Sequence, residues 1–176
     1  MNKWEEIINK TTADQGVKRQ FMDRLKSGHL TRDENPTSHF CSYFPAFDPH
    51  SRRVFMGLHK KSGLWLFNGG HIDKGEAPNQ AVTREISEEW GENIFVVIPP
   101  PSLLTITAIE NPKKQICEVH FDIWYFISVD MNMFAPDENK LSSEFSIWGW
   151  KTINEAKLLA KNKETVTALH TIEQLF

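Results

Sequence analysis

The chain has 176 residues, of which 40% are hydrophobic and 24% are charged, with a formal net charge of −3. This length suits one domain with a sizeable core and is short for two. The negative charge argues against a general electrostatic hold on nucleic acid, which requires a basic face. No apolar run approaches the roughly 20 residues of a membrane span, and MNKWEEIINKTT lacks the apolar run of a signal peptide, so we expect a cytoplasmic protein.

The first third of the chain predicts helices followed by strands. Residues 1–28 carry two short apolar stripes at helical spacing, and the polar residues and proline of 29–37 are typical of a connector. Strand-like segments follow at 38–47 and 53–59, and a third, LWLFN, leads into Gly69 and Gly70. We therefore expect a helical N-terminal extension, residues 1–37, packed on a domain formed by residues 38–176.

Residues 70–91 read GHIDKGEAPNQAVTREISEEWG and combine a glycine-acid loop with a predicted helix. Pro78 suits the first turn of that helix, and Gly91 stands where a glycine commonly ends one. Val82, Ile86 and Trp90 follow one another at intervals of four and predict the buried stripe. The opposite, acidic side of the helix must then face a cleft or solvent.

Three carboxylates gather on that acidic side. Residues three and four apart share a helix face, so Glu85, Glu88 and Glu89 project side by side. Like charges at this spacing destabilise a helix, and a bound cation is the simplest compensation. Ligands that are all oxygen suit hard ions such as Mg²⁺ or Mn²⁺, which in turn bind phosphates.

The rest of the chain alternates strands and helices. Pro99–Pro101 force a break, and residues 103–109 and 117–129 predict two strands around a turn at 110–115. Residues 131–144 predict a polar loop, FSIWGW a short strand, and residues 152–175 a helix. Mixed strands with central and terminal helices indicate an α/β or α+β fold, a sheet sandwiched by helices.

The two cysteines do not form a disulfide framework or a metal knuckle. Cys41 and Cys117 both stand among apolar, strand-like residues. Cysteine in such surroundings behaves as a small hydrophobic residue, so we expect two buried free thiols.

Residues 70–91 also resemble the Nudix box of the MutT-like Nudix hydrolases. The resemblance implies an α/β/α sandwich with a mixed sheet, to which the N-terminal helices would be an addition. The sequence departs from the pattern of the box at Glu92, where an apolar residue is usual. Before the box, Asn68 stands where many relatives have proline. The positions that fill the pattern in register are Gly70, Glu76, Arg84, Glu85, Ile86, Glu88, Glu89 and Gly91.

The resemblance assigns roles to these residues. Glu85, Glu88, Glu89 and the backbone carbonyl of Gly69 would bind the metal. Arg84 could pair with Glu76 and so hold the loop and orient Glu85. Gly70, with its neighbour, would let backbone approach the metal and the phosphates without a Cβ in the way.

Residues outside the box are expected to complete the site. Relatives often place a general base on a late loop before a tryptophan-containing strand, and Glu144 fits that position, with Glu85 as the alternative. His59, His71 and His120 could line the cleft and contact phosphate or base, and Trp65 could stack on a nucleobase. Structural roles, in the core or at the surface, are the alternative for each of these four side chains.

The resemblance implies an enzyme that needs Mg²⁺ or Mn²⁺ and hydrolyses a diphosphate linkage in a nucleoside diphosphate attached to another group, and we favour nucleoside triphosphates. One alternative is a Nudix domain that senses a nucleotide without hydrolysing it. Another is isoprenoid diphosphate isomerase chemistry, for which Cys41 is the conceivable cysteine. No nucleic-acid or membrane partner is expected, and a homodimer through the N-terminal helices stays open.

Overall fold

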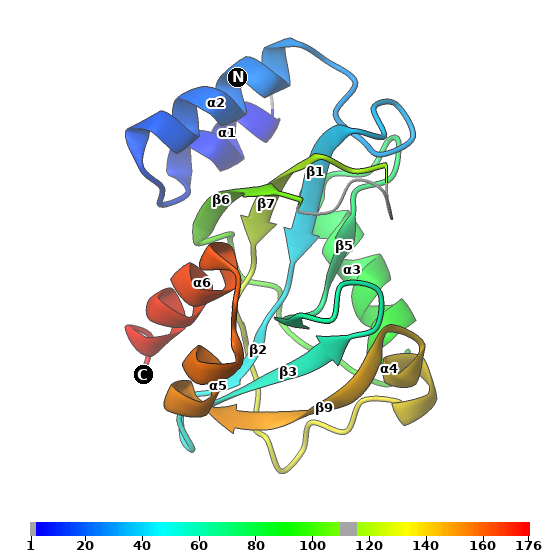
Figure 1. Cartoon of the computed structure of the whole chain (residues 1–176), viewed down its shortest axis with the longest axis vertical. Coiled ribbons are helices and arrows are strands. Elements are labelled where there is room, and N and C mark those ends of the chain that lie inside the picture. Colours follow the sequence, from blue (N-terminus) through cyan, green and yellow to red (C-terminus); the bar gives the residue numbers. More distant parts are fainter. Residues whose placement is uncertain (1–2, 110–115) are drawn as a thin grey trace.

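The computed structural model describes residues 3–109 and 116–176, which form two β-sheets packed between helices (Figure 1). In chain order the elements are α1 (Lys3–Lys10), α2 (Gln15–Lys26), β1 (Ser38–Tyr43), β2 (Ala46–Asp48), β3 (Arg53–His59), β4 (Trp65–Leu66), β5 (Gly69–His71), α3 (Pro78–Glu89), β6 (Leu103–Ala108), β7 (Val119–Trp124), β8 (Ile127–Ser128), α4 (Glu138–Glu144), β9 (Phe145–Thr152), α5 (Ile153–Leu159) and α6 (Lys163–Glu173). The predicted α/β class is confirmed.

One sheet has four strands in the order β5-β1-β7-β6. Strands β1 and β7 are parallel, and the outer pairs β1–β5 and β7–β6 are antiparallel. A second sheet has the order β4-β3-β2-β8, with β9 also paired to β3. The second sheet, like the first, contains both parallel and antiparallel strand pairs, which confirms the predicted mixed sheet.

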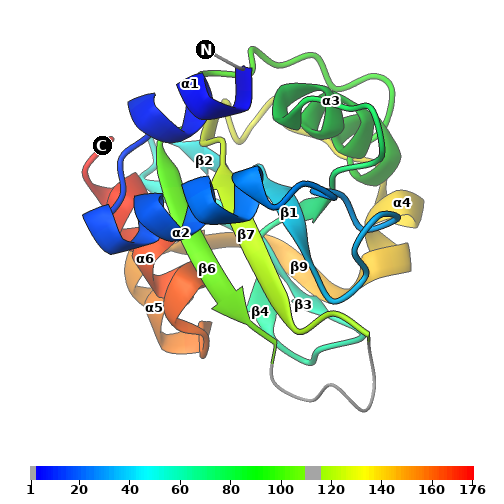
Figure 2. The same ribbon diagram turned by 90° about the horizontal axis from the view of Figure 1, so that it is seen from above.

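The N-terminal helices cover one face of the four-stranded sheet (Figure 2). Phe21 of α2 is fully buried, and its ring lies edge-on to Phe40 of β1 and Phe121 of β7, with ring centroids 5.5 and 5.2 Å apart. Trp4 of α1 packs on the same Phe40 ring at 5.1 Å. The predicted helical pattern is thus confirmed within residues 3–26, and residues 1–2 lie outside the described residues. The two helices are interrupted before Asp14, whose side chain accepts a hydrogen bond from the Gly16 amide at the start of α2.

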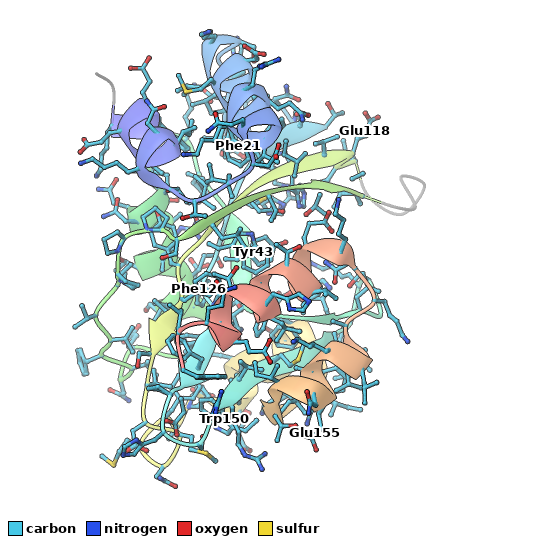
Figure 3. All side chains as sticks on the ribbon, turned by 90° about the vertical axis from the view of Figure 1, so that its left-hand side faces the viewer. Phe21, Tyr43, Glu118, Phe126, Trp150 and Glu155 are labelled. Carbon is cyan, nitrogen blue, oxygen red and sulfur yellow. The ribbon has the colours of Figure 1, made fainter. Side chains whose placement is uncertain are left out.

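The C-terminal helices pack elsewhere, α5 against β9 and β3 and α6 against β6. Their apolar side chains, among them Leu169 and Ile172, form a second core with Trp124 and Phe126. In Figure 3, Phe21 points from α2 towards the sheet, while Tyr43 and Phe126 lie close to α6. No helix among the described residues combines the length and the apolar character that crossing a bilayer requires.

Several predicted boundaries were wrong. The polar loop expected at 131–144 contains α4, because Asp137 caps the amides of Asn139 and Lys140 and Leu141 anchors the helix in the core. The strand expected at 38–47 splits at Phe44 and Pro45 into β1 and β2, which belong to different sheets.

Two further long elements are divided. The strand expected at 117–129 ends at Trp124 and resumes as β8 in the second sheet, and the helix expected at 152–175 breaks near Ala160 into α5 and α6. Strands β6 and β7 pair as predicted. The turn proposed between them, residues 110–115, lies outside the described residues.

Candidate active site

Arg84 holds the loop between β5 and α3. Its Nε and Nη2 atoms donate to the two carboxylate oxygens of Glu76 at 2.8 and 3.0 Å, and Nη2 also donates to the backbone carbonyl of His71 at 3.0 Å. The hydrogen bond from Arg84 holds the pKa of the Glu76 carboxyl below its usual value. The predicted pairing of Arg84 with Glu76 is therefore confirmed, and it ties the loop to the first turns of α3.

The same guanidinium organises two of the predicted metal ligands. Its Nη1 atom donates to Glu85 Oε1 at 2.8 Å and to Glu88 Oε2 at 3.1 Å. One planar, permanently charged group thus donates hydrogen bonds to three carboxylates and forms an ion pair with a fourth, Asp73, at 3.6 Å. This fixes the orientation of the three hydrogen-bonded carboxylates more firmly than an ammonium could. On the acidic side of α3, the Glu88 side chain is 57% exposed to solvent, whereas the Glu85 side chain is only 12% exposed.

Gly70 provides the surface on which Glu85 rests. A Cβ built on Gly70 would lie 1.9 Å from Glu85 Oε1 and 2.2 Å from the carboxyl carbon, closer than any real contact. Any residue other than glycine would therefore displace the Glu85 carboxylate. Glycine is required here for close approach of the Glu85 side chain to the backbone. The predicted approach of the metal and the phosphates to the glycine pair stays a prediction.

Glu89 is the most deeply buried carboxylate of the three, with the residue only 8% exposed. Burial raises its pKa to about 8, although the Asn68 side-chain amide donates to Glu89 Oε2 and opposes the shift. The nearby negative charges of Glu85 and Glu144 push the pKa of Glu89 further upward. Burial also raises the pKa of Glu85. This part of the site is short of positive charge.

Glu144 stands at the end of α4, directly before β9. Its Oε2 atom lies 3.3 Å from His59 Nε2, and the register of β3 with β9 pairs His59 with Phe145. Helix α4 is also tied to α3, because Lys140 Nζ donates to the Ser87 carbonyl at 2.9 Å. The carboxylate predicted as general base is thus held on the same side of the molecule as Glu89, by a helix end instead of the expected loop.

The four predicted substrate-binding side chains separate into different places. His71 and His120 lie together, with ring centroids 5.3 Å apart, whereas His59 contacts Glu144. Burial lowers the pKa of His71 to about 3 and that of His120 to about 4, so both rings are neutral at physiological pH. Trp65 lies in β4 with Lys151 Nζ 5.2 Å from its ring centroid, an ordinary cation–π contact.

Three residues of the region were not predicted. Asn68 had been noted only as a departure from the family pattern, yet it is the hydrogen-bond donor to buried Glu89. Lys140 fastens α4 to α3, and His39 joins the pair formed by His71 and His120. A histidine two positions before a cysteine in a strand, His39 and Cys41, was the available sign of the last group, because alternate residues share a face.

A cavity of about 470 Å³ lies beside the glutamate cluster of α3, which Glu85, Glu88 and Glu89 form. Its walls are residues 94–98 together with Thr83, Ile86 and Ser87 of α3. These side chains belong to a different side of the helix from Glu85 and Glu89. The predicted metal ligands Glu85, Glu88 and Glu89 therefore do not line this cavity.

Relatives were found by three kinds of comparison. The model of the NUDIX domain family matches residues 46–170, more than two thirds of the chain. An RNA pyrophosphohydrolase from Shewanella sediminis is 30% identical over 94 residues, which are 49% of this chain and 55% of that protein. The nucleoside triphosphatase NudI of Escherichia coli O139:H28 is 29% identical over 93 residues, which are 50% of this chain and 61% of that protein. The matches thus span little more than half the length of these two relatives.

Solved structures agree on the fold. The dihydroneopterin triphosphate pyrophosphohydrolase of E. coli superposes with a TM-score of 0.62 over 78% of this chain and 96% of that one, at 15% identity. A Nudix-family hydrolase from Clostridium perfringens has a TM-score of 0.58 over 78% and 98%, at 22% identity. Identities this low support the architecture alone. The family model, the box and the fold together establish that this chain is a member of the Nudix family.

Proposed function

We propose that the chain hydrolyses a diphosphate linkage in a nucleoside diphosphate attached to another group, with nucleoside triphosphates as the favoured substrates. The observation that carries this proposal is the contact of Arg84 with Glu76, Glu85 and Glu88 beside Gly70. The curated relatives named as a pyrophosphohydrolase and a triphosphatase support the same reaction class.

The side chains of this site fit a hard divalent cation, Mg²⁺ or Mn²⁺. The donors are carboxylate oxygens, and glycine at position 70 leaves the space that the Glu85 carboxylate occupies. The raised pKa of buried Glu89 marks a carboxylate that lacks a positive partner. Glu85, Glu88, Glu89 and the carbonyl of Gly69 would hold the ion, which when bound neutralises phosphate oxygens and lowers the pKa of the attacking water.

The remaining chemistry belongs to the protein's own residues. Arg84 and Glu76 keep the loop and Glu85 in place, a positioning role, and Gly69 and Gly70 admit a phosphate close to the backbone. Glu144 accepts the proton of the attacking water. His59, 3.3 Å from its carboxylate, orients that group.

Glu144 is a better general base than Glu85 because their surroundings differ. Glu85 accepts a hydrogen bond from Arg84 and lies against Gly70, so one of its oxygens is already engaged. The Glu144 carboxylate has no guanidinium partner among the described residues, and its side chain is 36% exposed. An exposed carboxylate beside the buried glutamates is accessible to water and substrate.

A hydrolysis screen tests the function. The protein would be incubated with nucleoside triphosphates, dinucleoside polyphosphates, nucleotide sugars and triphosphate-capped RNA in Mg²⁺ or Mn²⁺, with released phosphate and pyrophosphate as readouts. We expect turnover of at least one nucleoside triphosphate. Calorimetric binding of a nucleotide with no product over hours would instead identify the non-hydrolysing sensor.

The general base is tested by Glu144→Gln, which should lower kcat by about 10²- to 10⁴-fold with little change in melting temperature. Glu138→Gln, on the first turn of the same helix, is the matched control. A Glu144→Gln loss smaller than about threefold would return the role to Glu85.

Three narrower expectations remain predictions. Trp65 is the candidate for contact with a base, to be scored by KM in the same assay, whereas the buried, mutually packed rings of His71 and His120 favour the structural alternative. The homodimer is scored by sedimentation, and the cytoplasmic location by fractionation of the source cells.

A further inference from the structure

Three strands of the four-stranded sheet bring nitrogen and sulfur side chains to one face. The parallel register of β1 and β7 sets His39 opposite His120, and the antiparallel register of β1 and β5 sets Cys41 opposite His71. His39 and Cys41 are two residues apart in one strand, so their side chains point the same way. The sheet therefore collects three imidazoles and a thiol from segments that are distant in sequence.

The donor atoms of these side chains are close enough to share one ion. One ligand atom from each of His39, Cys41, His71 and His120 lies within 4.8 Å of all the others. Zinc bonds of about 2.0–2.3 Å in tetrahedral geometry imply ligand separations of roughly 3.3–3.7 Å, so small side-chain adjustments would complete the shell. The ring centroid of His39 is 4.8 Å from that of His71 and 4.9 Å from that of His120.

The ring nitrogens of His120 indicate that the cluster lacks a bound ion. Both of its ring nitrogens are shielded from solvent, and neither has a hydrogen-bond partner among the described residues. Buried polar nitrogens without partners destabilise a fold, so such groups are rare and call for an explanation. An ion bound by the imidazole would provide a partner for one of these two nitrogens.

His39 is already oriented as a ligand. Its Nδ1 atom lies 2.9 Å from the carbonyl oxygen of Asn35, so Nδ1 carries the proton and donates it, and Nε2 is the acceptor nitrogen of the ring. Metal-bound histidines usually have their second nitrogen fixed in this manner. The Nε2 atom faces the cluster, 3.7 Å from Cys117 Sγ.

We propose that His39, His71, His120 and Cys41 form a structural Zn²⁺ site, separate from the carboxylate site on α3. Three imidazoles and one thiolate suit zinc, whereas Mg²⁺ and Mn²⁺ prefer oxygen. Four protein ligands close the coordination shell, so the site stabilises the sheet and has no position for a reacting water. The Cys117 thiol lies beside the site, 3.9 Å from His71 Nε2, without being a ligand.

The first experiment measures zinc per chain in tag-free protein kept in excess Mg²⁺, which occupies carboxylate sites. We expect about one zinc per chain for the wild type and less than a tenth for His120→Leu. This variant loses no hydrogen bond, because the His120 ring makes none with the described residues. His50→Leu, at an exposed position, is the matched control and should retain the zinc.

Melting curves then separate a metal site from a purely structural cluster. Zinc at a hundredfold excess over its dissociation constant should raise the melting temperature of the chelator-treated wild type by about 5–10 °C and leave that of His120→Leu unchanged. Wild-type protein that binds no zinc and shows no shift, with His120→Leu at least as stable, would overturn the proposal.

Cobalt identifies the sulfur ligand. Co²⁺ in place of zinc should give a thiolate-to-metal charge-transfer band, which an all-oxygen site cannot produce. Cys41→Ser should abolish the band and Cys117→Ser should retain it. The reverse result, or a band that persists in both variants, would refute the assignment of Cys41 as the sulfur ligand, and absence of the band from the wild type would refute thiolate ligation.

Discussion

The two polar clusters of this protein meet at the three residues of β5, yet their chemistry is opposite. On one side Gly70 supports the carboxylate of Glu85, and Arg84 contacts the surrounding acids. On the other side the ring of His71 lies against His39 and His120. The first cluster is charged, partly exposed and made of oxygen; the second is mostly buried, neutral in its imidazoles and made of nitrogen and sulfur.

In our two proposals, one short strand contributes to the sites of two different ions. Ligand type decides which ion binds where, since hard cations favour carboxylates and zinc favours imidazole and thiolate. Because ligand type decides which ion binds, the two clusters can lie close together and still select different ions. Substitutions that affect one cluster should therefore leave the metal content of the other unchanged, and the following predictions test this independence in order of decreasing effect.

Glu89→Gln should have the largest effect. It removes a buried anionic oxygen that we assign to the divalent cation, while the amide keeps an oxygen to accept from Asn68. We expect kcat on the nucleotide identified by the screen to fall by roughly 10³-fold, equivalent to several kcal/mol of transition-state stabilisation. Zinc content should stay at the wild-type value. A variant with wild-type turnover would contradict the ligand assignment.

Gly70→Ala should come next, with a loss of turnover of about 100-fold, comparable to the largest effects of residues that orient a metal ligand. The added methyl group overlaps the Glu85 carboxylate, a mobile side-chain end, so activity should fall more than stability does. The measurements are kcat and melting temperature. Gly63→Ala is the control, because its positive φ of 68° strains alanine in open space and should lower stability by about 1 kcal/mol without changing kcat.

Arg84→Lys should lower turnover by about 10- to 50-fold, chiefly through weaker binding of Mg²⁺. A lysine keeps the charge but cannot donate to both oxygens of Glu76 and also reach Glu85. The dependence of rate on Mg²⁺ concentration measures this loss. Saturation at the wild-type Mg²⁺ concentration, with turnover equally reduced, would show that Arg84 acts directly on the substrate.

Asn68→Ala should have the smallest effect, about three- to tenfold in the Mg²⁺ concentration for half-maximal rate, since Glu89 keeps its oxygens and loses one donor. Asn68→Ser is the comparison, because a hydroxyl can restore part of the hydrogen bond. Equal rates for the two variants at every Mg²⁺ concentration would mean that the asparagine serves only the fold.

Local spacing made the carboxylate cluster predictable. The interval between Arg84, Glu85 and Glu88 fixes their common place on a helix, whatever the rest of the chain does. Pro78 and the glycine at 91 bound that helix, and the structure places Gly91 at a φ of 109° directly after Trp90. The contact between Arg84 and Glu76 followed from the same short segment.

The histidine cluster could not be predicted in the same way. His39, His71 and His120 come from three strands, and only the strand order and register bring them together. The same dependence on tertiary packing explains the division of residues 152–175. Helix α4 was missed for another reason, because a short helix with one fully buried anchor, Leu141, has the composition of a polar loop.

The register of β1 with β5 and β7 has a consequence for the order of folding. All four ligands could coordinate one ion only after both neighbouring strands had docked on β1. Contacts between such distant segments form late. Binding that is absent from the transition state slows unfolding and leaves the folding rate almost unchanged. Bound zinc would therefore increase the kinetic stability of this protein, because it would slow unfolding and lengthen the lifetime of the native sheet.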